Sequence, residues 1–121
     1  MVADILIVDD SETVRNSLRN WLESVFPSWS IEEAECGLEA VDCVLAHPPG
    51  IVLMDISMPG MNGIEATRRI KTVSAETKVV MLTIYEDAQY RADASMAGAS
   101  AYVIKRKMHT DLIPALVNLL A

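Results

Sequence analysis

Five short runs of apolar residues recur along the chain, and each is followed by a stretch with helical periodicity. The runs predict strands at residues 5–8, 28–34, 51–54, 78–82 and 100–104, of which the second is the weakest. Continuous apolar character is typical of strands that are covered on both faces, as in parallel sheets. Five strand–helix alternations with short connections therefore predict an α/β fold, a single-domain doubly wound parallel sheet with helices on both faces.

Apolar side chains at three- and four-residue spacing define the helices. These helices are expected at about residues 14–25, 38–45, 64–73, 88–97 and 112–120. Asp10 or Ser11 is expected to cap the first helix, and Gly98 to close the fourth in a left-handed conformation. Pro114 is compatible with the last helix only near its first turn, where a missing N–H group leaves no hydrogen bond unmade.

The length and the net charge of the chain indicate a single domain and argue against several classes of protein. A chain of 121 residues has the size of one domain. Seventeen acidic residues against ten Lys and Arg give a net charge of −7, which argues against direct nucleic-acid binding. The sequence has no apolar run of about 20 residues and no secretory signal pattern, so a cytoplasmic protein without membrane contact is expected. Cys36 and Cys43 lack zinc-site spacing and are interpreted as reduced thiols.

Polar side chains follow four of the five predicted strands. Asp9 and Asp10 follow the first strand, Asp55 the third, Thr83 the fourth and Lys105 the fifth. In doubly wound sheets, ligands bind beyond the carboxyl ends of the strands. Three carboxylates, a hydroxyl and an ammonium group would converge there if these strands are neighbours, and the inference rests on this conjunction.

The chemistry of this set favours phosphoryl transfer. Carboxylates that share a site repel one another, and a hard divalent cation such as Mg²⁺ removes that repulsion and neutralises phosphoryl oxygens. An aspartate carboxylate is a workable nucleophile for a phosphoryl group. Lys105 is placed to pair with one phosphoryl oxygen, and Thr83 to donate a hydrogen bond to another.

These residues, in this order, resemble the signature of the receiver domain of two-component response regulators. The match covers essentially the whole chain and comprises Asp9-Asp10, Asp55 with the loop Met58-Pro59-Gly60-Met61-Asn62-Gly63, Thr83 and Lys105. The resemblance implies a flavodoxin-like five-stranded sheet of order 2-1-3-4-5 with five helices. It also implies a signalling switch and not an enzyme, because the chain would catalyse only its own phosphorylation and dephosphorylation.

The resemblance assigns a role to each acidic residue. Asp55 would accept a phosphoryl group from a phosphohistidine on a sensor histidine kinase or a phosphotransfer protein. Asp10 and Asp55 would bind Mg²⁺ or Mn²⁺ directly, together with the backbone carbonyl of Ser57. Asp9 would act on the metal mainly through water.

The same resemblance implies how phosphorylation becomes a signal. Thr83 and Lys105 would grip the phosphoryl group, and Tyr102 would turn inward as Thr83 moves. The face made by the fourth helix, the fifth strand and the fifth helix would then change and control an output domain or a partner protein. Apart from the role of its lysine at the site, the run Lys105-Arg106-Lys107 is interpreted as a solvated positive rim.

Residues 82–87 and 97–102 are most similar to the subfamily that carries a C-terminal helix-turn-helix DNA-binding domain (NarL/FixJ/LuxR-like). No output domain follows here, so residues 1–121 are expected to be a receiver domain alone, either a fragment of a transcription regulator or a stand-alone regulator. A phosphorylation-dependent homodimer stays open.

Three alternatives use related folds or parts. A phosphorylation-independent protein-binding module is the main one, although such modules usually lack one site residue and none is missing in this sequence. A phosphatase of the haloacid-dehalogenase type would need a second acid–base carboxylate at the position of Ser57. A flavodoxin-like electron carrier would need a loop rich in Ser, Thr and Gly after the first strand, where Asp9 and Asp10 stand.

Overall fold

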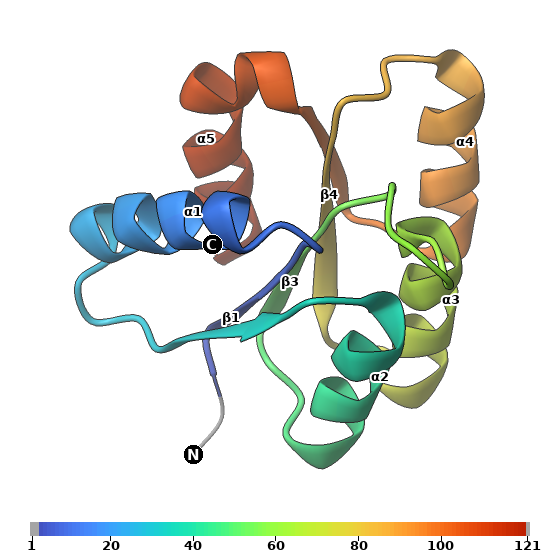
Figure 1. The fold of residues 1–121 in the computed structure, drawn as a ribbon, viewed down its shortest axis with the longest axis horizontal. Coiled ribbons are helices and arrows are strands. Elements are labelled where there is room, and N and C mark those ends of the chain that lie inside the picture. The colour runs from blue at the N-terminus through green and yellow to red at the C-terminus, as the bar shows by residue number, and fades with distance from the viewer. Residues whose placement is uncertain (1–2, 121) are drawn as a thin grey trace.

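Five parallel strands form one sheet in the computed structural model, which describes residues 3–120. The strands are β1 (Ile5–Val8), β2 (Ile31–Ala34), β3 (Ile51–Met54), β4 (Lys78–Thr83) and β5 (Ala101–Ile104). Their order across the sheet is β2-β1-β3-β4-β5 (Figure 1). The predicted fold class and strand order are therefore confirmed, and the direction of winding reverses between β1 and β3.

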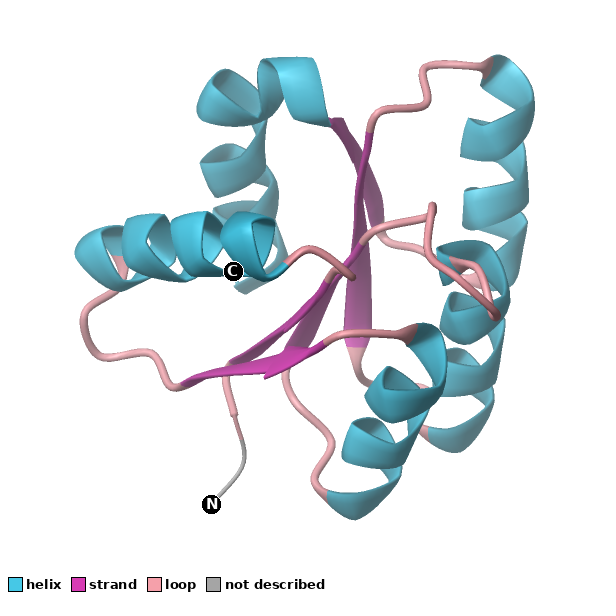
Figure 2. Cartoon of the chain, viewed as in Figure 1, coloured by secondary structure: helices cyan, strands magenta, loops and turns pink. Residues whose placement is uncertain are grey.

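Helices cover both faces of the sheet (Figure 2). They are α1 (Glu12–Val25), α2 (Gly37–Ala46), α3 (Gly63–Val73), α4 (Ala88–Ala97) and α5 (Met108–Leu120), and a 3₁₀ turn at Lys105–Lys107 precedes the last. Helices α1 and α5 lie on one face, and α2, α3 and α4 lie on the other (Figure 1). All five predicted helices are present.

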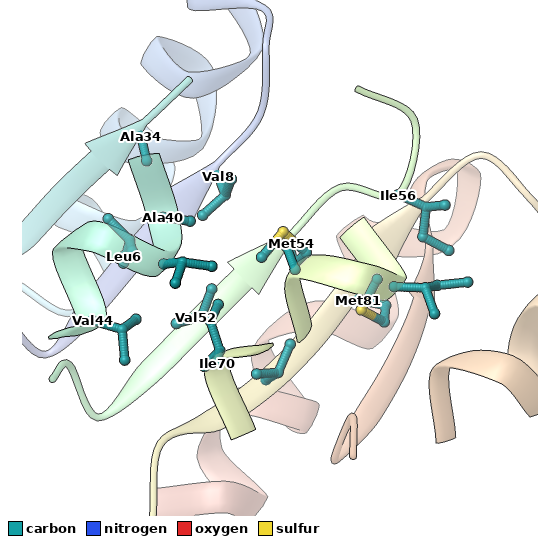
Figure 3. Close-up of a cluster of buried hydrophobic side chains, with 14 of the residues drawn as sticks. Leu6, Val8, Ala34, Ala40, Val44, Val52, Met54, Ile56, Ile70 and Met81 are labelled. Carbon is teal, nitrogen blue, oxygen red and sulfur yellow. The ribbon is translucent and has the colours of Figure 1, made fainter. Parts of the chain in front are cut away.

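Alternate residues of the inner strands enter two separate cores, as β1 shows. Leu6 and Val8 of β1 pack under α2 and α3 with the other side chains shown in Figure 3, whereas Ile5 and Ile7 pack under α1 and α5. Each of these four side chains is almost completely buried. Burial of a large aliphatic side chain stabilises the fold by roughly 1.5–3 kcal/mol. A strand whose side chains are buried in a core on both faces has no polar face, which explains the continuous apolar runs in the sequence.

Local hydrogen bonds at the helix ends follow the sequence signals. The Ser11 side chain accepts from the backbone N–H of Val14 at 3.3 Å and caps α1, which decides between Asp10 and Ser11. Gly98 closes α4 with φ of +107°, a left-handed conformation in which a side chain would be strained. The first cap fixes the point at which the chain enters α1 after β1, and the second fixes the point at which it leaves α4 for β5.

The second strand is shorter than the sequence predicted. It begins at Ile31 and not at residue 28, because the preceding residues form a turn. The backbone N–H of Trp29 donates to the carbonyl of Phe26 at 3.0 Å, and the two rings stack with centroids 3.8 Å apart. Trp29 therefore belongs to a local aromatic stack and not to the strand.

The prediction for Pro114 was also wrong. Helix α5 begins at Met108 and not near residue 112, because the 3₁₀ turn runs directly into it, so Pro114 lies inside the helix and not in its first turn. A proline there has no N–H group to donate to the carbonyl four residues earlier, that of Thr110. The helix continues to Leu120 because Leu112 and Leu116 are fully buried against the sheet.

Candidate functional site

The carboxyl ends of four neighbouring strands meet at one edge of the sheet. Asp9 follows β1, Asp55 follows β3, Thr83 is the last residue of β4, and Lys105 follows β5. The strands are in register up to this edge, with Val8 opposite Met54 and Thr83 opposite Ile104. The structure thus brings together the polar residues that the sequence placed at separate strand ends.

Three carboxylates form a compact acidic cluster. Asp9, Asp10 and Asp55 each offer an oxygen within 4.8 Å of the other two. Asp9 and Asp55 are buried, with 3% and 7% of their surface exposed, whereas Asp10 is open to solvent. Oxygen donors at this separation, with one side open to water, suit a hard divalent cation that keeps part of its hydration shell. The residues present therefore fit Mg²⁺.

The environment of Asp55 opposes its negative charge. Burial raises the pKa of Asp55 to about 6, and the charges of Asp9 and Asp10 act in the same direction. The ammonium group of Lys105 and a hydrogen bond from the backbone of Ser57 act against this rise without cancelling it. A cation at the cluster would favour the ionised form, which is the nucleophilic form of a carboxylate.

Lys105 lies between the two buried carboxylates. Its Nζ is 3.2 Å from Oδ2 of Asp9 and 3.8 Å from Oδ2 of Asp55. The side chain is 24% exposed, which agrees with the prediction that Lys105 belongs to the site and not to a solvated rim. An ammonium group in this position is available to a third negative group that arrives at Asp55.

Thr83 and Tyr102 are connected through one residue of the loop between β4 and α4. The fully buried Thr83 accepts at Oγ1 from the backbone N–H of Tyr85 at 3.2 Å. The hydroxyl of Tyr102 donates to the backbone carbonyl of the same Tyr85 at 2.8 Å. The guanidinium of Arg91 lies 4.6 Å from the centre of the Tyr102 ring. Movement of Thr83 would therefore displace the backbone of Tyr85 and, through it, Tyr102.

The loop after β3 is held tightly against the start of α3. The N–H of Gly63 donates to the carbonyl of Ile56 at 2.9 Å. A Cβ atom on Gly63 would lie 2.0 Å from the backbone oxygen of Asp55, which no structure tolerates. Glycine is therefore required at this position for Asp55 to stand where it does.

Sequence reasoning missed a buried arginine beside the site. Nη1 of Arg15 donates to the backbone carbonyl of Asp9 at 2.7 Å, and its Nε donates to Glu33 at 3.0 Å. The guanidinium groups of Arg19 and Arg15 hold the pKa of Glu33 below its usual value, against the effect of burial. No signal in the sequence distinguishes Arg15 from an ordinary polar residue of a surface helix, because its partners come from β1 and β2.

The fold and the acidic edge define a class: a doubly wound domain with a carboxylate cluster, a lysine and a threonine at the carboxyl ends of its strands. The chain matches the response regulator receiver domain family over residues 5–117. It belongs to that family. Receiver domains are signalling domains, which agrees with the sequence prediction.

Individual relatives are similar over nearly the whole chain. The response regulator UvrY of Escherichia coli O6:H1 is 38% identical over 113 residues, which is 93% of this chain and 52% of UvrY. The chemotaxis protein CheY of Halobacterium salinarum is 38% identical over 120 residues, covering 99% of this chain and 98% of CheY. The chain therefore spans about half the length of UvrY and nearly all of CheY.

A solved structure of a relative has the same fold. The response regulator protein TrrA of Thermotoga maritima, solved in complex with Mg(2+)-BeF, superposes with a TM-score of 0.84 at 33% identity, over 95% of this chain and 96% of TrrA. Among residues 3–120, no helix is long and apolar enough to cross a membrane.

Proposed function

We propose that this chain is a phosphorylation-activated switch and that Asp55 accepts the phosphoryl group. The observation that carries the proposal is the position of Asp55. Its buried carboxylate lies within 4.8 Å of two other carboxylates and 3.8 Å from the Lys105 ammonium group. The donor would be a phosphohistidine of a sensor histidine kinase or phosphotransfer protein. A carboxylate oxygen of Asp55 bonds to phosphorus while the P–N bond of the donor breaks and the imidazole leaves with the electron pair.

The acidic cluster is the proposed metal site. Asp9, Asp10 and Asp55 would hold Mg²⁺ or Mn²⁺, with the backbone carbonyl of Ser57 as a further ligand. A bound divalent cation supplies charge neutralisation for the phosphoryl oxygens. Lys105 is the second positive group at the site, and its contacts with Asp9 and Asp55 keep it within reach of a phosphoryl group on Asp55.

The proposed readout is a change in the face made by α4, β5 and α5. Phosphorylation adds about −1.5 to −2 charge and new acceptor oxygens. Thr83 would donate to one of these oxygens and give up its present bond with the N–H of Tyr85. Because Tyr102 bonds to the carbonyl of Tyr85, the loop after β4 and the Tyr102 side chain would move together and shift the population of two packings.

By analogy with the relatives, we also propose a biological setting. Residues 1–121 would form a receiver domain that regulates an output domain or a separate partner, with transcription as the regulated process and the cytoplasm as its place. The domain itself would bind neither nucleic acid nor membrane. Phosphorylation-dependent dimerisation through the α4, β5 and α5 face would be one form of output.

Intact-mass measurement after incubation with acetyl phosphate tests this function. Wild type in MgCl₂ should gain one phosphoryl group, and wild type in EDTA should gain none. Asp55→Asn should gain none in either buffer, whereas Asp42→Asn, which removes an exposed carboxylate of α2, should behave as wild type. Folded wild type that gains no adduct in MgCl₂ would favour the alternative, a protein-binding module that works without phosphorylation.

A further inference from the structure

An ion pair outside the acidic cluster joins the two connections, both called loops here, that follow β4 (residues 84–87) and β5 (the 3₁₀ turn at Lys105–Lys107). Nε of Arg106 donates to Oε2 of Glu86 at 3.0 Å, and Nη2 of Arg106 donates to Oε1 of Glu86 at 2.6 Å. Two parallel bonds between a guanidinium and a carboxylate fix orientation as well as distance. Arg106 is therefore engaged with a specific partner and is not only a solvated rim charge.

Both residues of the pair lie close in sequence to a residue of the proposed phosphoryl site. Glu86 stands three residues after Thr83, and Arg106 stands next to Lys105. The pairing of β4 with β5 ends at Thr83 and Ile104, so both loops leave the sheet at that point. Beyond it, the loops are joined by the Glu86–Arg106 pair, and the bond from Tyr102 to the carbonyl of Tyr85 ties the first loop back to β5.

We propose that Glu86 and Arg106 are positioning residues, which set the spacing of the two loops so that Thr83 and Lys105 reach the same phosphoryl group. The proposal rests on the proposed function of Asp55. Neither residue touches the acidic cluster: the contacts of Lys105 are with Asp9 and Asp55, and those of Arg106 are with Glu86. The pair would act by lowering the conformational entropy that is lost when two loops are brought to one ligand.

The magnitude is bounded by the exposure of the pair. The side chains of Arg106 and Glu86 are 61% and 46% exposed. Exposed pairs contribute little, and the best-oriented of them change an equilibrium or rate by up to about fivefold. Glu86→Gln and Arg106→Gln should each slow phosphorylation by acetyl phosphate about two- to fivefold. Because the two residues act as one unit, the double variant should be no slower than either single variant.

The direction in which each substitution changes the phosphorylation rate distinguishes a positioning role from electrostatic attraction of the phosphodonor. Acetyl phosphate is an anion, so if only the local charge mattered, loss of Glu86 would speed phosphorylation and loss of Arg106 would slow it. Positioning predicts that both substitutions slow it. The exchange Glu86→Arg with Arg106→Glu restores the pair with its charges reversed and should recover most of the wild-type rate.

The ion pair between Glu65 and Arg68 within α3 supplies matched controls. Both side chains are exposed and belong to a single helix, so the pair joins no two loops. Glu65→Gln and Arg68→Gln should leave the phosphorylation rate within twofold of wild type. All variants are compared at equal Mg²⁺ concentration, and thermal unfolding verifies that each is folded to the same extent.

The outcomes distinguish the two proposals. If wild type is not phosphorylated at all, the function proposed for Asp55 fails. If wild type is phosphorylated but the two single variants shift the rate in opposite directions, or their effects multiply in the double variant, the positioning role is wrong and the function stands. Equal slowing, no further loss in the double variant and recovery by the exchange would establish the role.

Discussion

Removal of the charge at Asp55 should stabilise the metal-free protein, although it abolishes the proposed acceptor. The buried carboxylate lies among Asp9 and Asp10, and the compensation from Lys105 is incomplete, so the ionised form is disfavoured in the folded state. Asn occupies nearly the same volume without a charge. The variant Asp55→Asn therefore relieves an unfavourable interaction that wild type carries at neutral pH.

The magnitude follows from the pKa. A rise from 3.8 to about 6 corresponds to about 3 kcal/mol of lost stability above pH 6, at about 1.4 kcal/mol per pKa unit. The sign is fixed by linkage: a folded-state pKa above the unfolded one penalises folding when the group is ionised. The advantage of Asn should be complete above about pH 6, decline as the pH falls toward 3.8, and vanish below it. Because Asn still buries a polar amide, we expect a gain of about 1–3 kcal/mol at pH 7.5.

Urea unfolding in EDTA across this pH range measures the effect. Asp42→Asn, at an exposed position of α2, serves as the control and should differ little from wild type. Addition of MgCl₂ should stabilise wild type more than Asp55→Asn, because a cation that binds only the folded cluster adds to its stability. If Asp55→Asn is no more stable than wild type at pH 7.5 in EDTA, the electrostatic account of the cluster is refuted.

Three further substitutions test the packing around the site. Gly63→Ala places a Cβ atom 2.0 Å from the carbonyl oxygen of Asp55, so we expect a loss of about 3 kcal/mol in urea unfolding together with loss of phosphorylation; a normal rate would contradict this. Tyr102→Phe removes the bond to Tyr85 and should cost about 1 kcal/mol in thermal unfolding, while the mass adduct still forms. Leu112→Ala empties a fully buried position under α5 and should cost about 2–5 kcal/mol in urea unfolding without changing the phosphorylation rate of the folded fraction.

The parts of the site that were predictable from the sequence are those set by local signals. A strand ends where its apolar run ends, so the residues that follow it are known before the fold is. Asp9, Asp55, Thr83 and Lys105 were assigned in this way, and parallel pairing brings such ends to one edge. The order of the strands is not a local property, and its prediction depended on the resemblance to receiver domains.

Contacts between distant segments were not predictable in this way. Arg15 bonds to Asp9, which follows β1, and to Glu33 of β2, and Arg106 bonds to a residue twenty positions earlier. Each looks like a surface cation in the sequence, because nothing in its neighbourhood specifies the partner. The wrong start of the second strand, predicted at residue 28, has the same origin: the stacking of Trp29 on Phe26 accompanies a turn that nothing in the apolar pattern specifies. The early start of α5 depends on the 3₁₀ turn by which the chain leaves β5, and the apolar periodicity of the sequence does not indicate that turn.

The residues of the site are synthesised at different times, because they lie at the ends of four strands that are far apart in the sequence. The carboxylates follow β1 and β3, whereas Thr83 ends β4 and Lys105 follows β5, and these two strands leave the ribosome after the other three. Until β5 joins the sheet, the acidic residues lack Lys105, and β4, which carries Thr83, is paired only with β3. A nascent or truncated chain without β5 would therefore lack the complete set of residues that we propose for phosphorylation.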